Sequence, residues 1–307
     1  MQPGTLPAMP LIRTYLSLAL AAVLWGANFN LAKPVLAEMS PLAAGAWRYI
    51  IAAVIVLAVL FSTGGRLLLR HFKSYLVLGL FGVFGYNVFF FLALQTTSAV
   101  NASLIMALNP LLTLIVAYFV LGERPRLMQT LAIPIGLAGV VIVVLGSHGH
   151  SGVAYGDAFM FVASLTWAFY SVFVRKVMPR DATATANISG IMLTGAIGLT
   201  VASFLSGSGL PVPSPHVGIA LVVLAVGGGL IAYFLWNAGV AKVGAGSASL
   251  FINLVPVASM LISTALGSPP TASQLLGGAV VIAAVSLSTI SGSGERLIAN
   301  AQTSGLK

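Results

Sequence analysis

The sequence has no cysteine and few charged side chains, and these two absences remove several classes of protein. Without a thiol there is no disulfide framework, no cysteine nucleophile and no cysteine-ligated zinc. Only 6% of the 307 residues are charged, whereas soluble domains carry about 25%. The sequence also lacks a phosphate-binding loop, a zinc-protease motif and a Ser-His-Asp arrangement. These absences argue against an enzyme, an ATP-driven pump and any resident metal or cofactor, and they favour an integral membrane protein.

Hydrophobic residues make up 59% of the chain, and they are arranged in long continuous runs. A hydrocarbon core about 30 Å thick needs roughly 20 apolar residues in a helix. Ten stretches of this kind occur, whereas a transmembrane barrel would show alternating segments of about ten residues. The sequence therefore predicts an all-α polytopic membrane protein with ten transmembrane helices. They are Tyr15–Val35, Leu42–Phe61, Tyr75–Leu94, Asn101–Leu121, Leu127–Leu145, Ala158–Met178, Ala186–Leu205, Val217–Val240, Ser247–Leu266 and Ala272–Ile290.

The basic residues indicate how these helices are oriented. Of the 14 Lys and Arg residues, 12 fall in the two tails and in alternate joins, and the exceptions are Lys33 and Arg48. Because positive charge is retained on the cytoplasmic side, both termini are predicted to be cytoplasmic, in a cell inner membrane. The net charge of +9 then reflects topology, and no nucleic-acid partner is expected.

The two halves of the chain, residues 1–150 and 151–307, are similar to each other. Trp25 is followed eight residues later by Lys33, and Trp167 by Arg175. Each half contains five predicted spans, an odd number, so the halves must cross the membrane with opposite polarity. Two inverted five-helix repeats are typical of secondary transporters, whose substrate site lies near the midplane between the repeats.

The fourth span of each half contains a proline. Asn101-Ala102-Ser103-Leu104 precedes Pro110, and Ser247-Ala248-Ser249-Leu250 precedes Pro256. A proline inside a helix leaves a backbone carbonyl without its hydrogen bond. We therefore expect Pro110 and Pro256 to bend their helices and to act as hinges.

Several of these segments carry a family resemblance that covers nearly the whole chain. Trp25-Gly26-Ala27-Asn28-Phe29, Arg48-Tyr49, Thr97-Ser98-Ala99, Pro110 and Leu121-Gly122-Glu123-Arg124 resemble EamA-type members of the drug/metabolite transporter superfamily. The resemblance implies ten helices in two inverted units and the export of amino acids or related metabolites, with aromatic amino acid exporters as one branch. The second half departs from the pattern, since Ser268 stands where the first has Glu123 and no arginine matches Arg48.

Aromatic and amide side chains near the centres of the spans are the candidate substrate site. Trp usually lies at the membrane surface, so Trp25 and Trp167 at span centres suggest a stacking wall, with helix packing as the alternative. Intramembrane amides should face the protein interior, to bind substrate or to join helices. The predicted binding residues are Trp25, Asn28, Tyr86, Asn87, Phe90, Asn101, Trp167, Tyr170, Tyr233, Trp236 and Asn237.

Three cations are the candidate residues of the mouths. Lys33 and Arg48 lie toward the outer side, where they attract a carboxylate or simply extend to the membrane surface. Arg175 is the counterpart of Lys33 at the inner mouth, although the positive-inside rule alone accounts for it.

The acidic residues are all placed away from span centres. Glu123 could pair with Arg124 or Arg126, and Glu38 and Asp157 are expected at the outer surface. Proton-driven carriers usually keep an ionisable group in the membrane. The sequence thus favours facilitated or exchange transport without a buried carboxyl.

The resulting prediction is a transporter of neutral or zwitterionic metabolites, most of all aromatic or hydrophobic amino acids, working by alternating access. A channel-like pore for small neutral solutes and a carrier of other specificity are the alternatives. The expected partners are a small-molecule substrate and the lipid bilayer, and the protein is expected to be a monomer.

Overall fold

The structure is a computed structural model that describes the backbone of residues 8–147 and 155–304. Those residues form helices and contain no strand, which confirms the all-helical prediction. Eight helices within them are long and apolar enough to cross a membrane, and two shorter apolar helices cover Phe251–Ala265 and Ala272–Ser288. The number of ten transmembrane helices therefore stays a prediction. The predicted separation of the spans Tyr75–Leu94 and Asn101–Leu121 by a break at Gln95–Ser98 is confirmed, because one helix ends at Thr96 and the next begins at Ala99.

The two halves contain similar orders of helices, although the second half has one continuous helix, Ala232–Ser249, across the predicted join between Val240 and Ser247. The first half consists of α1 (Ala8–Leu36), α2 (Pro41–Ser62), η1 (Leu69–His71), α3 (Phe72–Gly79), η2 (Leu80–Gly85), α4 (Tyr86–Thr96), α5 (Ala99–Met106), α6 (Asn109–Leu121) and α7 (Leu127–Ser147). The second consists of α8 (Tyr155–Val177), α9 (Ala184–Leu205), α10 (Pro215–Val222), η4 (Val223–Ile231), α11 (Ala232–Ser249), η5 (Leu250–Asn253), α12 (Leu254–Ala265) and α13 (Ala272–Ser304).

Local sequence explains where several of these helices begin. Ser40, Thr183 and Ser214 precede α2, α9 and α10, and each side chain accepts a hydrogen bond from the backbone N–H three residues later. Such capping satisfies a donor that the first helical turn leaves unpaired. The proline that follows Ser40 and Ser214 suits the first helical position, where no N–H is needed.

The third span of each half is interrupted by a π-helix. In the first half it is η2, followed by α4, and in the second it is η4, followed by α11. Both segments are rich in glycine, with Gly82 and Gly85 in η2 and Gly227 to Gly229 in η4. Because π-helices are rare and are frequently found at functional sites, their presence at equivalent places makes this level of the bundle a candidate functional region.

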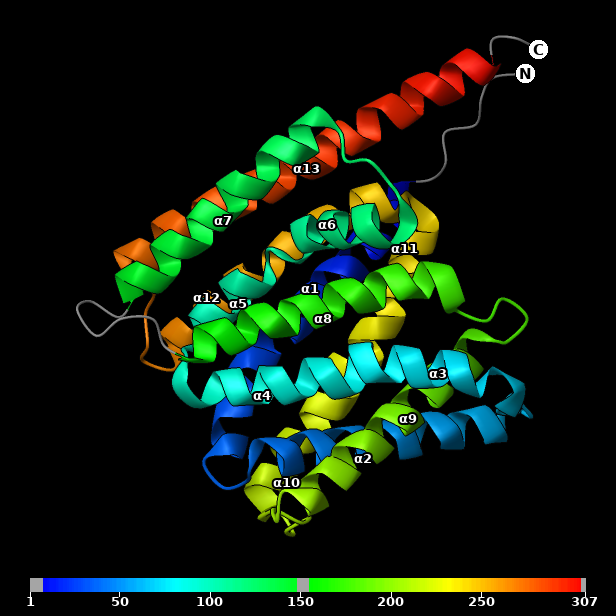
Figure 1. Cartoon of the computed structure of the whole chain (residues 1–307), viewed down its shortest axis with the longest axis vertical. Coiled ribbons are helices and arrows are strands. Elements are labelled where there is room, and N and C mark those ends of the chain that lie inside the picture. The colour runs from blue at the N-terminus through cyan, green and yellow to red at the C-terminus, as the bar shows by residue number, and fades with distance from the viewer. Residues whose placement is uncertain (1–7, 148–154, 305–307) are drawn as a thin grey trace.

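Equivalent helices of the two halves pack in pairs, and the first helix of each half packs into the other. α2 lies along α9 and α7 lies along α13, as Figure 1 shows. α1 contacts α11, α12 and η4 of the second half, while α8 contacts α4, α6 and η2 of the first. The two halves are therefore interleaved.

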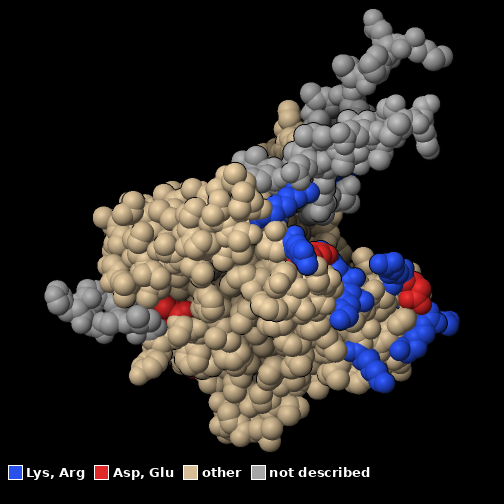
Figure 2. All heavy atoms as spheres, turned by 45° about the horizontal axis from the view of Figure 1, so that its top comes forward, with Lys and Arg blue, Asp and Glu red and all other residues tan. Residues whose placement is uncertain are grey.

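The two ends of the bundle differ in charge. Figure 2 shows that the Lys and Arg residues of the visible face gather at one end. There, Arg70 pairs with Asp181 at 2.6 Å and Arg175 pairs with Glu123 at 3.0 Å. We call this end, which contains links 63–68, 122–126 and 178–183, the basic end. The other end, which we call the opposite end, contains links 37–40, 97–98, 206–214 and 266–271.

Two of the acidic residues have partners that the sequence did not predict. Glu123 binds Arg175 of α8, so the prediction of Arg124 or Arg126 as its partner is wrong. At the opposite end the carboxylate of Glu38 accepts hydrogen bonds of 2.6 Å from the backbone N and the Oγ of Ser214. Both contacts join the first half of the chain to the second.

Candidate substrate site

Eight aromatic side chains from four helices form a connected group, which we call the aromatic cluster. Each helix contributes two residues spaced three or four apart, so the two side chains lie on one face of that helix. The members are Trp25 and Phe29 of α1, Tyr86 and Phe90 of α4, Trp167 and Tyr170 of α8, and Tyr233 and Trp236 of α11. Seven of these eight residues are among the predicted binding residues, and Phe29 is the exception.

Contacts between these side chains connect the four helices in a closed order. Trp25 meets Trp236 with ring centroids 5.3 Å apart, and Trp167 meets Tyr86 at 5.2 Å. These two contacts join the halves. Phe29 meets Phe90 at 5.4 Å within the first half, and the hydroxyls of Tyr170 and Tyr233 lie 3.3 Å apart within the second.

The glycines of the two π-helices allow the close approach of α1 and α8. A Cβ on Gly228 would lie 2.1 Å from Oδ1 of Asn28, and one on Gly82 would lie 2.4 Å from the ring of Tyr170. Asn28 comes three residues after Trp25, and Tyr170 comes three residues after Trp167. Trp25 also donates its indole N–H to the Gly228 carbonyl at 3.0 Å. The same arrangement is therefore built twice, once from each half.

Arg48 of α2 is buried next to the aromatic cluster, with only 4% of its surface exposed. Its Nη1 donates to Oδ1 of Asn87 at 3.3 Å, and Asn87 donates to the carbonyl of Val83 at 2.7 Å. The guanidinium carbon lies 5.4 Å from the centre of the Tyr49 ring and 5.9 Å from that of Phe90. Arg48 therefore does not extend to the membrane surface, and that alternative is wrong for this residue.

Lys33 lies where α1 and α4 end together. Its Nζ donates to the carbonyl of Leu94 at 2.8 Å and to the carbonyl of Thr97. A cation bonded to the last carbonyls of a helix satisfies acceptors that the helix itself leaves free. Lys33 and Leu94 also line a pocket of about 310 Å³. They follow Phe29 and Phe90 by four residues, so this pocket lies one helical turn from the cluster.

Asp157 is buried, contrary to the expectation that it lies at the outer surface. Only 3% of it is exposed, and its Oδ1 accepts hydrogen bonds from Thr97 Oγ1 and, at 3.4 Å, from Asn101. Gln274 of α13 donates to Asn101 at 2.7 Å. The prediction that no carboxyl is buried among the helices is therefore wrong. Asn101, predicted to bind substrate, belongs to this network.

Two further predicted residues lie apart from the aromatic cluster. Asn237 is exposed, and its amide donates to the carbonyl of Tyr233 one turn earlier in α11. Arg175 is exposed at the basic end, where Glu123 binds it. Asn237 thus bonds only the backbone of a cluster residue, and Arg175 bonds no residue of the cluster.

Both candidate hinge prolines lie just after an interruption of their helices. α5 ends at Met106, and Pro110 is the second residue of α6. In the second half the 3₁₀ segment η5 ends at Asn253, and Pro256 is the third residue of α12. Asn109 donates to the carbonyl of Ser164 at 2.9 Å, which ties the first break to α8.

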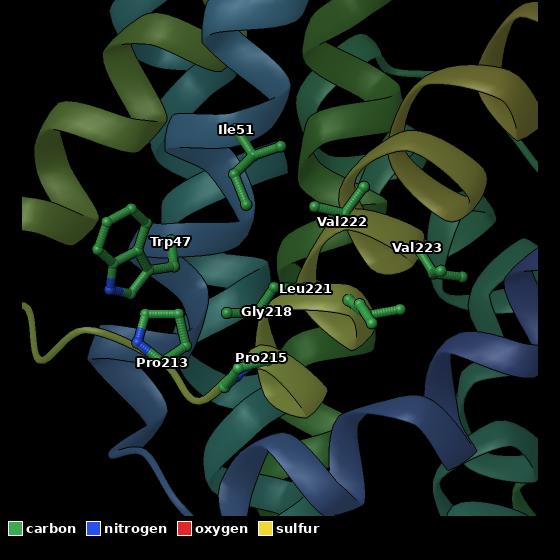
Figure 3. A pocket seen from close by; sticks show the side chains of 9 residues that line it. Trp47, Ile51, Pro213, Pro215, Gly218, Leu221, Val222 and Val223 are labelled. Atoms are coloured by element: carbon green, nitrogen blue, oxygen red, sulfur yellow. The ribbon is translucent and has the colours of Figure 1, made fainter.

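A second pocket, an apolar groove of about 440 Å³, runs between α2 and α10 (Figure 3). Trp47 and Ile51 line it from α2, and Gly218 and Val222 line it from α10. Trp47 donates its indole N–H to the carbonyl of Pro211 at 2.9 Å. No side chain of the aromatic cluster lines this groove.

Among the residues that the structure describes, no group of three or more His, Cys, Asp or Glu could hold a metal ion. The segment His148-Gly149-His150, whose two histidines are potential metal ligands, lies outside the described residues. The donors of the cluster are indole and phenol groups, with the amides of Asn28 and Asn87 beside it, and such groups suit a small organic molecule with an apolar part.

Comparison with known proteins assigns the chain to a family. The sequence model of the EamA-like transporter family matches residues 12–145 and, a second time, residues 154–290. The chain belongs to the EamA-like transporter family. The two matches confirm the resemblance and the two copies of its unit, and they make the protein a multi-pass membrane transporter for a small-molecule substrate.

Relatives of this EamA-like protein match it over most of their length. The uncharacterized transporter YyaM of Bacillus subtilis is 35% identical over 89% of this chain and 92% of its own. The uncharacterized inner membrane transporter YedA of Escherichia coli K12 is 27% identical over 87% and 88%. The aromatic amino acid exporter YddG of Ancylobacter novellus is 27% identical over 88% and 94%. A chain of known crystal structure superposes with a TM-score of 0.65 at 23% identity, covering 92% of this chain and 98% of that one, which supports the fold.

Proposed function

We propose that this EamA-like protein is a secondary transporter that exports neutral or zwitterionic small metabolites, above all aromatic and hydrophobic amino acids. The observation that carries the proposal is the aromatic cluster, because both halves build it and its contacts join them. The relative YddG is named an aromatic amino acid exporter. Aromatic side chains bind apolar and aromatic groups through large contact areas and preferred ring geometries.

The cluster contains groups that a substrate could still use. Trp25, Tyr86, Trp167, Tyr233 and Trp236 are only half-buried, so parts of their surfaces stay accessible. The Asn28 side chain is 7% exposed and makes no hydrogen bond within the described residues. A buried amide without a partner is costly, so a polar substrate group that bonds it would be stabilised there.

The mechanism we propose is alternating access, with the two halves rocking about the cluster. Support comes from the π-helices η2 and η4 and from the helix breaks before Pro110 and Pro256, all at equivalent places in the halves. Replacing either proline by alanine should lower turnover more than expression. Equal losses of flux and expression would point to a packing role.

The topology we propose places two inverted halves in the inner membrane, as a monomer, with both termini cytoplasmic. The distribution of basic residues supports it, and the relative YedA is named an inner membrane transporter. Because the chain has no cysteine, single cysteines can be labelled without background. An impermeant maleimide should label Ser206→Cys in intact cells and Thr63→Cys only after lysis, and the reverse pattern would overturn this orientation. Light scattering of the purified protein would test the monomer.

Counterflow in proteoliposomes tests the transport proposal. Vesicles loaded with unlabelled phenylalanine should accumulate labelled phenylalanine, tryptophan and leucine transiently and with saturation. Trp167→Phe should weaken this uptake. Trp47→Phe, in the groove between α2 and α10, is the matched control and should leave it unchanged. Uptake without saturation or counterflow would favour the channel-like pore, and no uptake of any amino acid would favour a carrier of other specificity.

A further inference from the structure

Arg48 is a buried cation with unusually few partners. Nη1 bonds Asn87, while Nε is buried and makes no hydrogen bond, and the described residues include no carboxylate that pairs with this guanidinium. A guanidinium carries five N–H donors and no acceptor. Most of the hydrogen-bonding capacity of Arg48 is therefore unused inside a membrane protein.

A charge in this position needs a compensating group. Burial of an unpaired ion is strongly unfavourable, and buried charges are normally paired and hydrogen-bonded. The rings of Tyr49 and Phe90 lie within 6 Å of the guanidinium, but such cation–π contacts do not replace a paired and hydrogen-bonded anion. Ionisable residues that persist within membrane segments usually mark a substrate pathway.

The position of Arg48 connects it to the aromatic cluster. Phe90 belongs to that cluster and also contacts the guanidinium. Asn87, which bonds the guanidinium, directly follows Tyr86, another member of the cluster, in α4. The bond from Asn87 to the Val83 carbonyl fixes the Asn87 side chain. A molecule stacked on these aromatic side chains would thus have its polar end within reach of a cation.

We infer that Arg48 binds a carboxylate of the transported substrate and that Asn87 positions the guanidinium for it. Arginine binds carboxylates through two parallel hydrogen bonds, which fix orientation as well as charge. No arginine occurs in α9, the counterpart of α2, so the two halves offer one such receptor. This inference rests on the proposed function and deepens it: the substrate carries an anionic group and binds in one orientation.

The experiment compares the transport of an amino acid with that of an analogue whose carboxylate is replaced by an uncharged amide. Phenylalanine and phenylalanine amide are offered to proteoliposomes that contain the wild type, Arg48→Gln, Arg48→Lys or Arg66→Gln. Arg66 is exposed at the basic end and makes no hydrogen bond or ion pair with a described residue of the cluster, so its variant is the matched control. We expect Arg48→Gln to raise KM for phenylalanine about tenfold to a hundredfold, the loss of a charge-assisted bond, with little change for the amide. The KM of Arg48→Lys for phenylalanine should lie between those of the wild type and Arg48→Gln, because lysine keeps the charge but cannot form the two parallel hydrogen bonds.

A binding measurement separates this inference from the proposed function. The carboxylate 3-phenylpropanoate should raise the thermal stability of the detergent-solubilised wild type and of Arg66→Gln, but not of Arg48→Gln. That result would support the carboxylate site even if the wild type moved no amino acid, in which case only the proposed function would fall. Equal losses for phenylalanine and its amide in Arg48→Gln, or no stabilisation of the wild type by the carboxylate, would overturn the inference.

Discussion

The first helices of the two halves occupy equivalent places but present different chemistry there. α1 places Trp25 against Trp236 and the amide of Asn28 against Gly228. α8 places Trp167 against Tyr86 and the phenol of Tyr170 against Gly82. The duplicated backbone therefore fixes where side chains meet, while single residues decide what those meeting points can bind.

The same contrast holds away from the cluster. Arg48 in α2 has no counterpart in α9. Asp157 lies ten residues before Trp167 and is buried in a polar network in the first turn of α8. The equivalent residue of α1 is Tyr15, ten residues before Trp25, and its ring stacks on Phe251 with centroids 5.7 Å apart. The two halves thus share one arrangement of helices but differ in the buried polar side chains that they carry.

The largest expected effect comes from filling the space between α1 and η4. Gly228→Ala should abolish most transport, because the new Cβ would overlap Asn28, and overpacking of this kind destabilises by about 1–3 kcal/mol. Gly227→Ala is the control, since its Cβ would come no closer than 3.7 Å to any neighbour. Counterflow and expression check both variants, and adding Asn28→Ala should restore the expression of Gly228→Ala because it removes the overlapping side chain. A fully active Gly228→Ala protein would contradict the tight contact.

Next in size is the polar network around Asp157. Asp157→Asn should lower the free energy of unfolding by about 1–3 kcal/mol, since charged acceptors for Thr97 and Asn101 are lost in a buried site. Tyr15→Phe keeps its stack on Phe251 and should change stability little. Denaturant unfolding in detergent micelles measures both. Similar stabilities of Asp157→Asn and the wild type would show that the buried network contributes nothing.

A smaller difference should separate the two central tryptophans. Trp25→Phe and Trp167→Phe remove similar apolar area, but only Trp25 has an indole hydrogen bond, to the Gly228 carbonyl. We expect Trp25→Phe to be the less stable by about 0.5–1.5 kcal/mol. Paired unfolding curves give this difference directly, and a less stable Trp167→Phe would reverse the comparison.

The smallest effect concerns the exposed contacts at the two ends. Hydrogen bonds from Ser214 lower the pKa of Glu38 from 4.5, and Arg70 and then His71 lower the pKa of Asp181 from 3.8. A carboxyl whose pKa is lowered by folding adds stability above its unfolded pKa and loses it as pH falls through its folded pKa. Glu38→Gln should therefore be slightly less stable than the wild type at pH 7, and this gap should close below pH 4.5. A stability difference between Glu38→Gln and the wild type that stays constant down to pH 3 would contradict the lowered pKa of Glu38. Asp181→Asn should show the same loss of its stability difference at slightly lower pH.

The parts predicted from the sequence are those that depend on length and periodicity. The hydrophobic runs predict the helices, because about 20 apolar residues are needed to span the membrane. The run from Tyr75 to Leu121 is too long for one span, which predicts the break at Gln95–Ser98. The repeat brought Trp25 and Trp167 to equivalent positions, and both lie in the aromatic cluster. These features need no knowledge of how helices rotate against each other.

The errors concern the direction in which a side chain points. Asp157 was placed correctly near a helix end, but depth along a helix does not tell whether a residue faces lipid or a neighbouring helix. Glu123 was paired with nearby arginines, although the interleaving of the halves brings Arg175 closer. Phe29 was overlooked because its partner Phe90 lies 61 positions away in the chain. The role of Gly82 depends likewise on Tyr170, which belongs to the other half.

The interleaving of the halves has a consequence for how such a protein could have arisen. Each half keeps the surfaces that cover the other's first helix, so a half expressed alone would expose them to lipid. Co-expressed as two separate chains, the halves should restore activity that neither has by itself. An ancestor with a single copy of the unit would have needed a second copy of itself to cover the same surfaces.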